Sequence, residues 1–213
     1  MSEYTPVDKA TWNHASLFES YRGGEFPYIN LGARVDVTRL LTRAREAGLS
    51  TYFSLIHTAT ATADDLEPFH LRILDGEPVR FACSTPVLTH MRPGDEIFFM
   101  MEGKTGVGVR EFCLDLREKA KTPPVDEERL DVKANGLISY SCIPWLDYTH
   151  FIRTITHLGQ DSNPKMSWGK YVTENGRTTV NFSVQVHHGL MDGWHVGQYF
   201  KRLQERLDAF EVE

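Results

Sequence analysis

Hydrophobic and polar side chains alternate near the carboxyl end of the chain. In residues 178–186 every second position is apolar, at Val180, Phe182, Val184 and Val186. This period of two predicts a strand with one buried face, because successive side chains on a strand point to opposite sides. Residues 168–172 predict its partner, since Asn175-Gly176 between the two segments is a strong hairpin-turn signal.

The period changes directly after this strand. Apolar side chains then recur three or four positions apart, at Val196, Tyr199, Phe200, Leu203, Leu207 and Phe210. That spacing predicts a helix that buries one stripe. The same criterion predicts helices over residues 37–47, 52–65 and 109–120, and Ser50 is a favourable N-cap for the second.

The remaining pattern completes a mixed architecture. Residues 71–74 and 79–81 predict a hairpin around Asp75-Gly76, and residues 136–141 predict a further strand. The charged segment 125–133 is expected to be a solvated loop or short helix. We therefore expect an α+β fold, with a mixed and partly antiparallel sheet flanked by helices.

Composition narrows the class of protein. A chain of 213 residues with 41% hydrophobic content can bury one core, so we expect a single domain over residues 1–213. The net charge of -6 argues against a nucleic-acid partner, which needs a concentrated basic surface. No segment approaches the roughly 18 apolar residues of a membrane span, and the first nine residues lack the apolar run of a signal peptide.

The cysteines point to a compartment. Cys83, Cys113 and Cys142 are odd in number and lack CxxC spacing. They therefore indicate no disulfide framework. A reducing, cytoplasmic location is expected.

Two adjacent histidines, His187 and His188, stand where the predicted strand gives way to the predicted helix. Imidazole is suited to general base catalysis because its pKa lies near neutrality. Neighbouring strand residues point to opposite faces, so both rings can enter one site only if the strand ends between them. Asp192 is a favoured N-cap type for the helix that follows, and Gly193 tolerates a tight turn.

At these residues the chain resembles a known family. His187-His188-Gly189-Leu190-Met191-Asp192-Gly193 fits the HHxxxDG motif of CoA-dependent acyltransferases, and its surroundings are similar to the chloramphenicol acetyltransferase family. Further similar pieces follow in the expected order: Trp12 to Tyr21-Arg22, Ser141-Cys142-Ile143-Pro144-Trp145, and Ser167-Trp168-Gly169-Lys170-Tyr171. The resemblance covers nearly the whole chain and implies the single-domain fold of that family.

The resemblance implies an activity: transfer of an acetyl group from acetyl-CoA to a hydroxyl of a small molecule, chloramphenicol being one candidate. By position in the motif, His188 would be the general base and Ser141 would stabilise the oxyanion. Asp192 would brace the loop through an ion pair with an arginine near the amino terminus. The matching position here is His14, so the expected partner is either a protonated His14 or Arg22.

Substrate positions follow from the same resemblance. Lys170 and Tyr171 would line the CoA side, and Ser167 would lie near the reacting centre. Aromatic side chains would line the acceptor pocket, at Phe26, Tyr28, Phe98 and Phe99. The segment 23–28 departs from the family pattern, which leaves the acceptor open. The family also implies a homotrimer with active sites at subunit interfaces.

Three alternatives compete with this interpretation. One is the acyltransferase core of a 2-oxo acid dehydrogenase complex, although lipoyl and linker regions are absent from the sequence. A second is a metal site formed by His187, His188, Asp192 and His195, although their spacing is not HExxH and no metal is expected. The third is a non-catalytic oligomeric binding protein that retains the fold.

Overall fold

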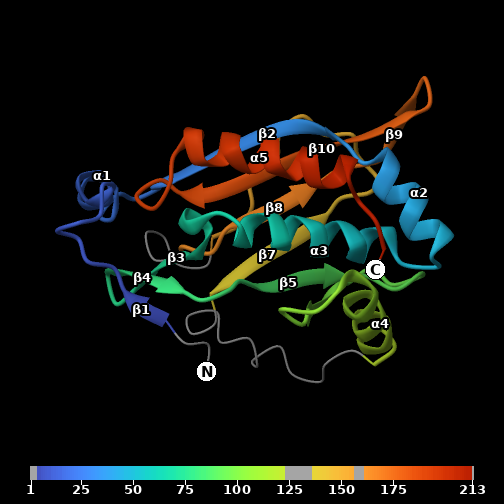
Figure 1. Cartoon of the computed structure of the whole chain (residues 1–213), viewed down its shortest axis with the longest axis horizontal. Helices are drawn as coiled ribbons and strands as arrows, with labels where there is room; N and C mark the ends of the chain where they lie inside the picture. The colour runs from blue at the N-terminus through green and yellow to red at the C-terminus, as the bar shows by residue number, and fades with distance from the viewer. Residues whose placement is uncertain (1–3, 123–135, 156–160, 213) are drawn as a thin grey trace.

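A mixed sheet forms the centre of the computed structural model, which describes residues 4–122, 136–155 and 161–212 (Figure 1). Its strands are β2 (Tyr28–Asp36), β5 (Thr85–His90), β6 (Phe99–Glu102), β7 (Leu137–Cys142), β8 (Lys165–Trp168), β9 (Val172–Glu174) and β10 (Arg177–His187). The order is β2-β10-β8-β7-β5-β6, and β9 pairs with the start of β10. Strands β5, β7 and β8 run parallel, and the other pairs are antiparallel. The prediction of a mixed, partly antiparallel sheet is confirmed.

A second, smaller sheet contains the predicted hairpin. It consists of β1 (Tyr4–Pro6), β4 (Glu77–Phe81) and β3 (Leu71–Leu74), in the order β1-β4-β3. The hairpin turns at Asp75 and Gly76, whose φ angles are 51° and 80°. Two consecutive positive φ angles are the geometry that Asp-Gly favours in a two-residue hairpin. A short 3₁₀ helix, η1 (Glu67–His70), leads into β3.

Helices cover one face of the central sheet. They are α2 (Thr38–Glu46), α3 (Thr51–Asp64), α4 (Val109–Lys119) and α5 (Gly193–Asp208), while α1 (Ala15–Tyr21) lies apart, beyond the end of the sheet (Figure 1). Helices α3 and α5 run side by side across the sheet, nearest the viewer in Figure 1. The four predicted helices are confirmed, including Ser50 as the cap that accepts from Phe53 N–H at 3.3 Å.

The two faces of the sheet differ in character. Towards the helices, β7, β8 and β10 present buried apolar side chains: Ile138, Tyr140, Met166, Trp168, Val180, Phe182, Val184 and Val186. Trp168 and Phe182 stack there, with ring centroids 5.6 Å apart. The alternating residues on the opposite face are polar, among them Ser139, Ser141, Ser167 and Ser183.

Residues 147–153 lie against this polar face. Tyr148 Oη is 3.0 Å from Ser183 Oγ, and Asn30 Nδ2 donates to the carbonyl of Phe151 at 2.8 Å. The backbone N–H of Arg153 donates to Gln185 Oε1 at 2.9 Å. Polar strand residues therefore hold the segment by hydrogen bonds, which satisfies backbone groups that would otherwise be buried without partners.

The prediction of one continuous strand over residues 168–172 is wrong. Strand β8 ends at Trp168, and β9 begins only at Val172. Between them the Lys170 N–H leaves the sheet to donate to Leu146 O at 2.8 Å. The chain passes so close to that loop that a Cβ on Gly169 would lie 2.6 Å from Leu146 O. The charged segment 125–133 lies outside the described residues.

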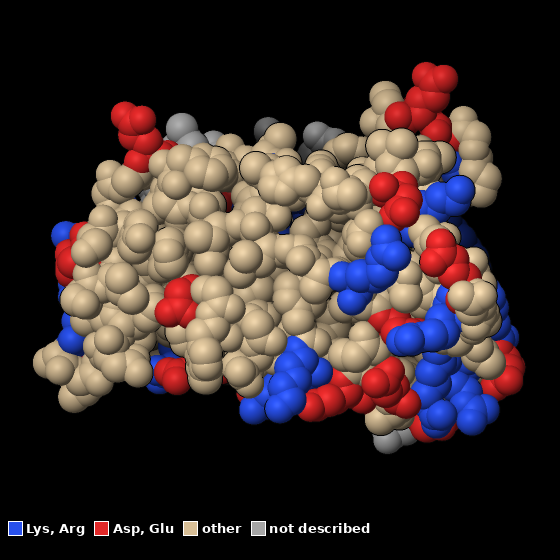
Figure 2. Space-filling view, turned by 90° about the horizontal axis from the view of Figure 1, so that it is seen from above, with Lys and Arg blue, Asp and Glu red and all other residues tan. Residues whose placement is uncertain are grey.

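Charge is unevenly distributed over the surface. The face on the side of the edge strand β2 carries few Lys, Arg, Asp or Glu side chains, which gather instead at the end holding β9 and α2 (Figure 2). Exposed apolar side chains on or just before this strand include Phe26 and Leu31. Within the described ranges, no helix has both the length and the apolar character needed to cross a bilayer.

Candidate active site

The histidine loop joins β10 to α5. His187 is the last residue of the strand, and His188 is the first residue beyond it. The strand therefore ends between the two histidines, which frees the second ring from the alternation of the sheet. Asp192 caps α5 by accepting from Trp194 N–H at 2.9 Å and from His195 N–H at 3.4 Å.

His188 is partly buried and makes three contacts that position it. Its backbone N–H donates to Pro27 O at 2.7 Å, and its ring lies 4.3 Å from the ring of Tyr21, centroid to centroid. Its Nδ1 lies 3.3 Å from Met191 O. A carbonyl can only accept, so in the neutral ring Nδ1 carries the proton and Nε2 keeps its lone pair. Nε2 is therefore the nitrogen that can take a proton from a substrate.

His187 has a different environment. Its side chain is fully buried, and its Nδ1 accepts from Gly189 N–H at 3.1 Å. Burial lowers the pKa of His187 to about 4, and neighbouring His188 acts in the same direction. The ring is thus neutral near neutral pH, and it stabilises the turn by accepting the Gly189 N–H.

The brace of the loop is local. His195 Nδ1 lies 3.1 Å from Asp192 Oδ1 and 3.1 Å from the Asp192 N–H, which closes a capping box at the start of α5. Burial alone would raise the pKa of Asp192. The backbone N–H groups of Trp194 and His195, with the nearby imidazoles, hold that pKa below its usual value.

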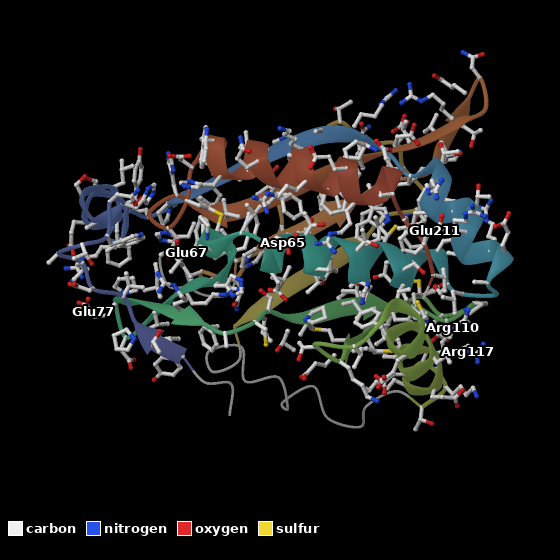
Figure 3. The ribbon with its side chains drawn as sticks, in the orientation of Figure 1. Asp65, Glu67, Glu77, Arg110, Arg117 and Glu211 are labelled. Carbon is white, nitrogen blue, oxygen red and sulfur yellow. The ribbon has the colours of Figure 1, made fainter. Side chains whose placement is uncertain are left out.

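Asp192 was expected to pair with His14 or Arg22. Among the residues that the structure describes, neither forms an ion pair with Asp192. Arg22 pairs with Glu19 at 2.8 Å and lies 3.6 Å from Glu77, which projects beneath α1 in Figure 3. His14 is buried beside the loop, with its ring 5.5 Å from that of His195. Burial lowers the pKa of His14, which disfavours the protonated form that an ion pair requires.

Ser141 and Ser167 lie together in another part of the sheet. Ser141 pairs with Ser167 across β7 and β8, and Ser167 pairs with Ser183 across β8 and β10. Thr89 Oγ1 donates to Ser141 Oγ at 3.5 Å, which leaves the Ser141 proton available for a substrate. Ser167 is buried, and its Oγ has no hydrogen-bond partner in the described part of the chain.

This serine row is distant from the histidine loop within one chain. His187 lies four residues beyond Ser183 on β10, and Ser141 lies two strands away from it. With about 3.3 Å per residue and 4.8 Å between strands, the separation is roughly 16 Å. A single chain therefore does not bring the proposed base and the proposed oxyanion donor to one reacting atom.

The remaining predicted positions are also divided. Lys170 is exposed and Tyr171 is partly buried, and both follow β8 beside the loop containing Trp145. Phe26 and Tyr28 adjoin the histidines, with the Tyr28 ring 5.4 Å from His187. Phe98 and Phe99 lie at the far edge of the sheet, at β6. The four aromatic residues predicted for the acceptor pocket therefore do not meet within one chain.

Sequence reasoning missed two contacts of the site. Tyr21 was part of the resembling segment, but the contact of its ring with His188 depends on how α1 docks. Arg153 carries no motif, yet its guanidinium donates to Ser139 on the polar face, with Nη2 2.9 Å from Ser139 Oγ. The metal alternative gains no support, since the described residues contain no group of three or more ligands placed to hold an ion.

The fold is similar to that of solved acetyltransferases. A solved chloramphenicol acetyltransferase superposes with a TM-score of 0.88 at 21% identity, covering 96% of this chain and all of that one. A probable dihydrolipoamide acetyltransferase from Listeria monocytogenes matches at a TM-score of 0.67 and 14% identity, over 98% and 95% of the two chains.

Sequence comparison specifies the family. The family model described as chloramphenicol acetyltransferase matches residues 2–204, so the chain belongs to that family and is an acetyltransferase. Among curated relatives, a chloramphenicol acetyltransferase of Escherichia coli is 24% identical, over 98% of this chain and 95% of the relative. Chloramphenicol acetyltransferase 2 of Escherichia coli is 26% identical, over 96% and 97%.

Proposed function

We propose that the protein transfers the acetyl group of acetyl-CoA to a hydroxyl of a small molecule, with His188 as the general base. The observation that carries this proposal is the state of the His188 ring. The ring contact with Tyr21 and the contact of Nδ1 with Met191 O orient Nε2 as a proton acceptor. An alcohol needs such a base, because it is a weak nucleophile until its proton leaves.

The reaction then has defined roles. Nε2 of His188 takes the hydroxyl proton while the hydroxyl oxygen bonds to the thioester carbon. The carbonyl oxygen becomes an oxyanion, which the Ser141 hydroxyl stabilises by donating a hydrogen bond. Collapse of this intermediate breaks the carbon–sulfur bond, and the leaving thiolate of CoA receives the proton from the imidazolium. Ser167 adjoins Ser141, while Lys170 and Tyr171 bind CoA beyond the carboxyl end of β8.

We further propose that two copies of the chain complete each site, within a homotrimer. The roughly 16 Å between the serine row and the histidine loop supports a donor and a base from different subunits. The face beside β2 supports it too, because subunit interfaces are depleted of charge at their centre (Figure 2). Trimeric assembly remains a proposal that light scattering on the purified protein can test.

The acceptor is a small hydroxylated compound, and chloramphenicol is the first to test because the relatives carry its name. Thiol release from acetyl-CoA should be measured with chloramphenicol and a panel of alcohols. We expect His188→Ala to lower turnover about 100- to 10,000-fold, the usual contribution of a general base. His187→Asn is the matched control at the neighbouring ring.

Three results separate the possibilities. Turnover of other alcohols without chloramphenicol would keep the reaction and change the acceptor. Equal turnover in wild type and His188→Ala would contradict the role of His188. Absence of thiol release with every acceptor would favour the non-catalytic binding protein.

A further inference from the structure

The polar face of the sheet contains a second row beside the serine row. Across β2, β10, β8 and β7 the aligned residues are Asn30, Gln185, Lys165 and Ser139. Gln185, Lys165 and Ser139 each lie two positions from a member of the serine row, and so on the same face, about 7 Å away. Asn30 lies opposite Gln185 on β2. The resemblance to the family led us to expect aromatic and apolar side chains around the acceptor, but this row is polar and charged.

This row lies on the acceptor side of the reacting centre, if the proposed roles of Ser141, Lys170 and Tyr171 hold. Strand β8 runs from Lys165 through Ser167 towards Lys170. CoA would lie beyond the carboxyl end of that strand. The acceptor hydroxyl must approach the thioester carbon from another direction, within about 3.5 Å. The row at Ser139 and Lys165 is on the side of Ser141 opposite to Lys170.

Arg153 supplies the cation of this region. Its Nη1 donates to Ser139 O at 3.2 Å and its Nη2 to Ser139 Oγ at 2.9 Å, so the guanidinium is fixed over the amino half of β7. The side chain is only partly buried, and Ser139 and Ser141 are partly exposed as well. The guanidinium is therefore placed on the same face as the proposed oxyanion donor, within reach of a small molecule.

Arg153 and Lys165 differ in whether a carboxylate forms a salt bridge with them. Lys165 Nζ lies 2.6 Å from Asp161 Oδ2, in a buried pair. Arg153 has no salt bridge to any residue in the described ranges. Burial lowers the pKa of Arg153, which reflects the cost of holding this charge away from water. A guanidinium presents paired N–H donors that fit carboxylate or phosphate oxygens.

We propose that Arg153 sets the acceptor specificity of this enzyme: the hydroxylated acceptor carries a carboxylate or phosphate that the guanidinium binds. This inference rests on the proposed function, because it assigns the substrate class of the same site. It distinguishes the acceptor from chloramphenicol, which has no anionic group. Arg153 binds the acceptor and takes no part in proton transfer.

The test compares acceptors that differ only in charge. Thiol release is measured with 4-(hydroxymethyl)benzoate against 4-(hydroxymethyl)benzamide, and with glycerol 3-phosphate against glycerol, so that carboxylate and phosphate are separate arms. In the wild type, kcat/KM should be about 10- to 100-fold higher for the preferred anion, as for one hydrogen bond to a charged group. Arg153→Met should abolish the preference and leave the KM for acetyl-CoA unchanged, and Arg153→Lys should restore part of it.

Controls separate binding from folding. Arg177 is an exposed arginine at the start of β10, away from Arg153, and it pairs with Asp36 of β2. The variant Arg177→Met should keep the full preference for the anionic acceptor. Thermal unfolding of Arg153→Met and Arg153→Lys shows whether the segment 147–153 still packs. Equal kcat/KM for charged and neutral acceptors, or a preference that survives in Arg153→Met, overturns the inference while thiol release upholds the proposed function.

Calorimetry tests the anion site in case the protein shows no turnover. If none of the acceptors is turned over, the proposed function falls, and titration of the CoA-saturated protein with both benzyl alcohols and with glycerol 3-phosphate decides the anion site. Binding of an anion that disappears in Arg153→Met supports the site. Absence of any such binding overturns it.

Discussion

The two halves of the proposed site are built in different ways. The histidine loop is braced by neighbours in sequence, because Met191, Asp192 and His195 contact one another or His188 across a few residues, and His188 also contacts Pro27 and Tyr21. The serine row is assembled by the register of three strands, β7, β8 and β10. The contacts within the histidine loop join residues of one short motif. The serine row, in contrast, forms only when the three strands pair. The first half is thus visible in the sequence, and the second depends on the whole fold.

The largest expected effect tests whether the two halves meet between chains. Ser141→Ala should lower turnover about 100- to 1,000-fold, the usual loss when one oxyanion donor is removed. Co-expression of His188→Ala with Ser141→Ala should then restore activity in mixed oligomers. In about one quarter of the sites an intact histidine of one copy would face an intact serine of the next, if assembly is random and cyclic.

The control for this experiment is the pair of variants mixed after separate purification, without exchange of subunits. If co-expressed chains form mixed oligomers and still show no activity above the single variants, each site lies within one chain. The separation estimated from the strand register would then have to close by a rearrangement of the loop.

The second prediction concerns the pH dependence of stability, through His187. Its folded pKa of about 4 lies below the ordinary value near 6.5, so between these values the unfolded chain binds a proton that the folded chain does not. The contribution of His187 to the free energy of unfolding should therefore be fully present above about pH 6.5. It should be lost as the pH is lowered to about 4. Between pH 7 and 5 the loss should be on the order of 2 kcal/mol.

Urea unfolding at the two pH values checks this expectation. His187→Asn should show a smaller loss than the wild type, because Asn does not titrate. Comparing the two proteins removes the contribution of all other titrating groups. An equal loss in both would mean that His187 is not the residue responsible.

The third prediction separates the cap from the charge at Asp192. Asp192→Ala should lower the free energy of unfolding by about 1 kcal/mol and also lower turnover, because it removes the acceptor for Trp194 N–H and His195 N–H. Asp192→Asn keeps a capping oxygen and removes the negative charge beside His195. Calorimetric melting with parallel thiol-release assays measures both. Full stability of Asp192→Ala with selective loss of rate would count against a structural role.

The smallest expected effect is at Tyr21, whose ring contacts the ring of His188 from the amino-terminal part of the chain. Tyr21→Leu should lower kcat/KM two- to fivefold, in keeping with an aromatic contact of about 0.5–1 kcal/mol. Tyr21→Phe keeps the ring and should retain activity. Loss of rate in Tyr21→Phe would instead assign a role to the hydroxyl.

The predicted elements succeeded where a periodic apolar pattern was long enough. Helices α2, α3, α4 and α5 and strand β10 show such patterns, because each buries one stripe or one face in the core. Helix α1 was not predicted, since its seven residues bury only Phe18. Strand β2 was also missed: its burial pattern is irregular, as is common for an edge strand.

The site divides in the same way. The capping role of Asp192 was predicted from residue type and position, whereas the strand end between His187 and His188 was only a condition that the structure then met. The choice between His14 and Arg22 as partner of Asp192 could not be made that way, because it depends on where α1 docks. The local contact with His195, three residues away, was not considered. Arg22 lies beside Glu19 and Glu77 instead, where opposite charges attract it. The aromatic residues Phe26 and Phe98 look equivalent in sequence but occupy opposite edges of the sheet.

The sequence by itself determined the α+β character of the protein, its family and the histidine that is proposed to act as base. These depend on short-range patterns, in which local geometry follows from residue type and spacing. The tertiary structure alone decided that Tyr21 orients His188, that Arg153 lies over Ser139, and that the serine row stands apart from the histidine loop. Contacts between residues distant in the chain are set by strand order and register, which no local pattern specifies.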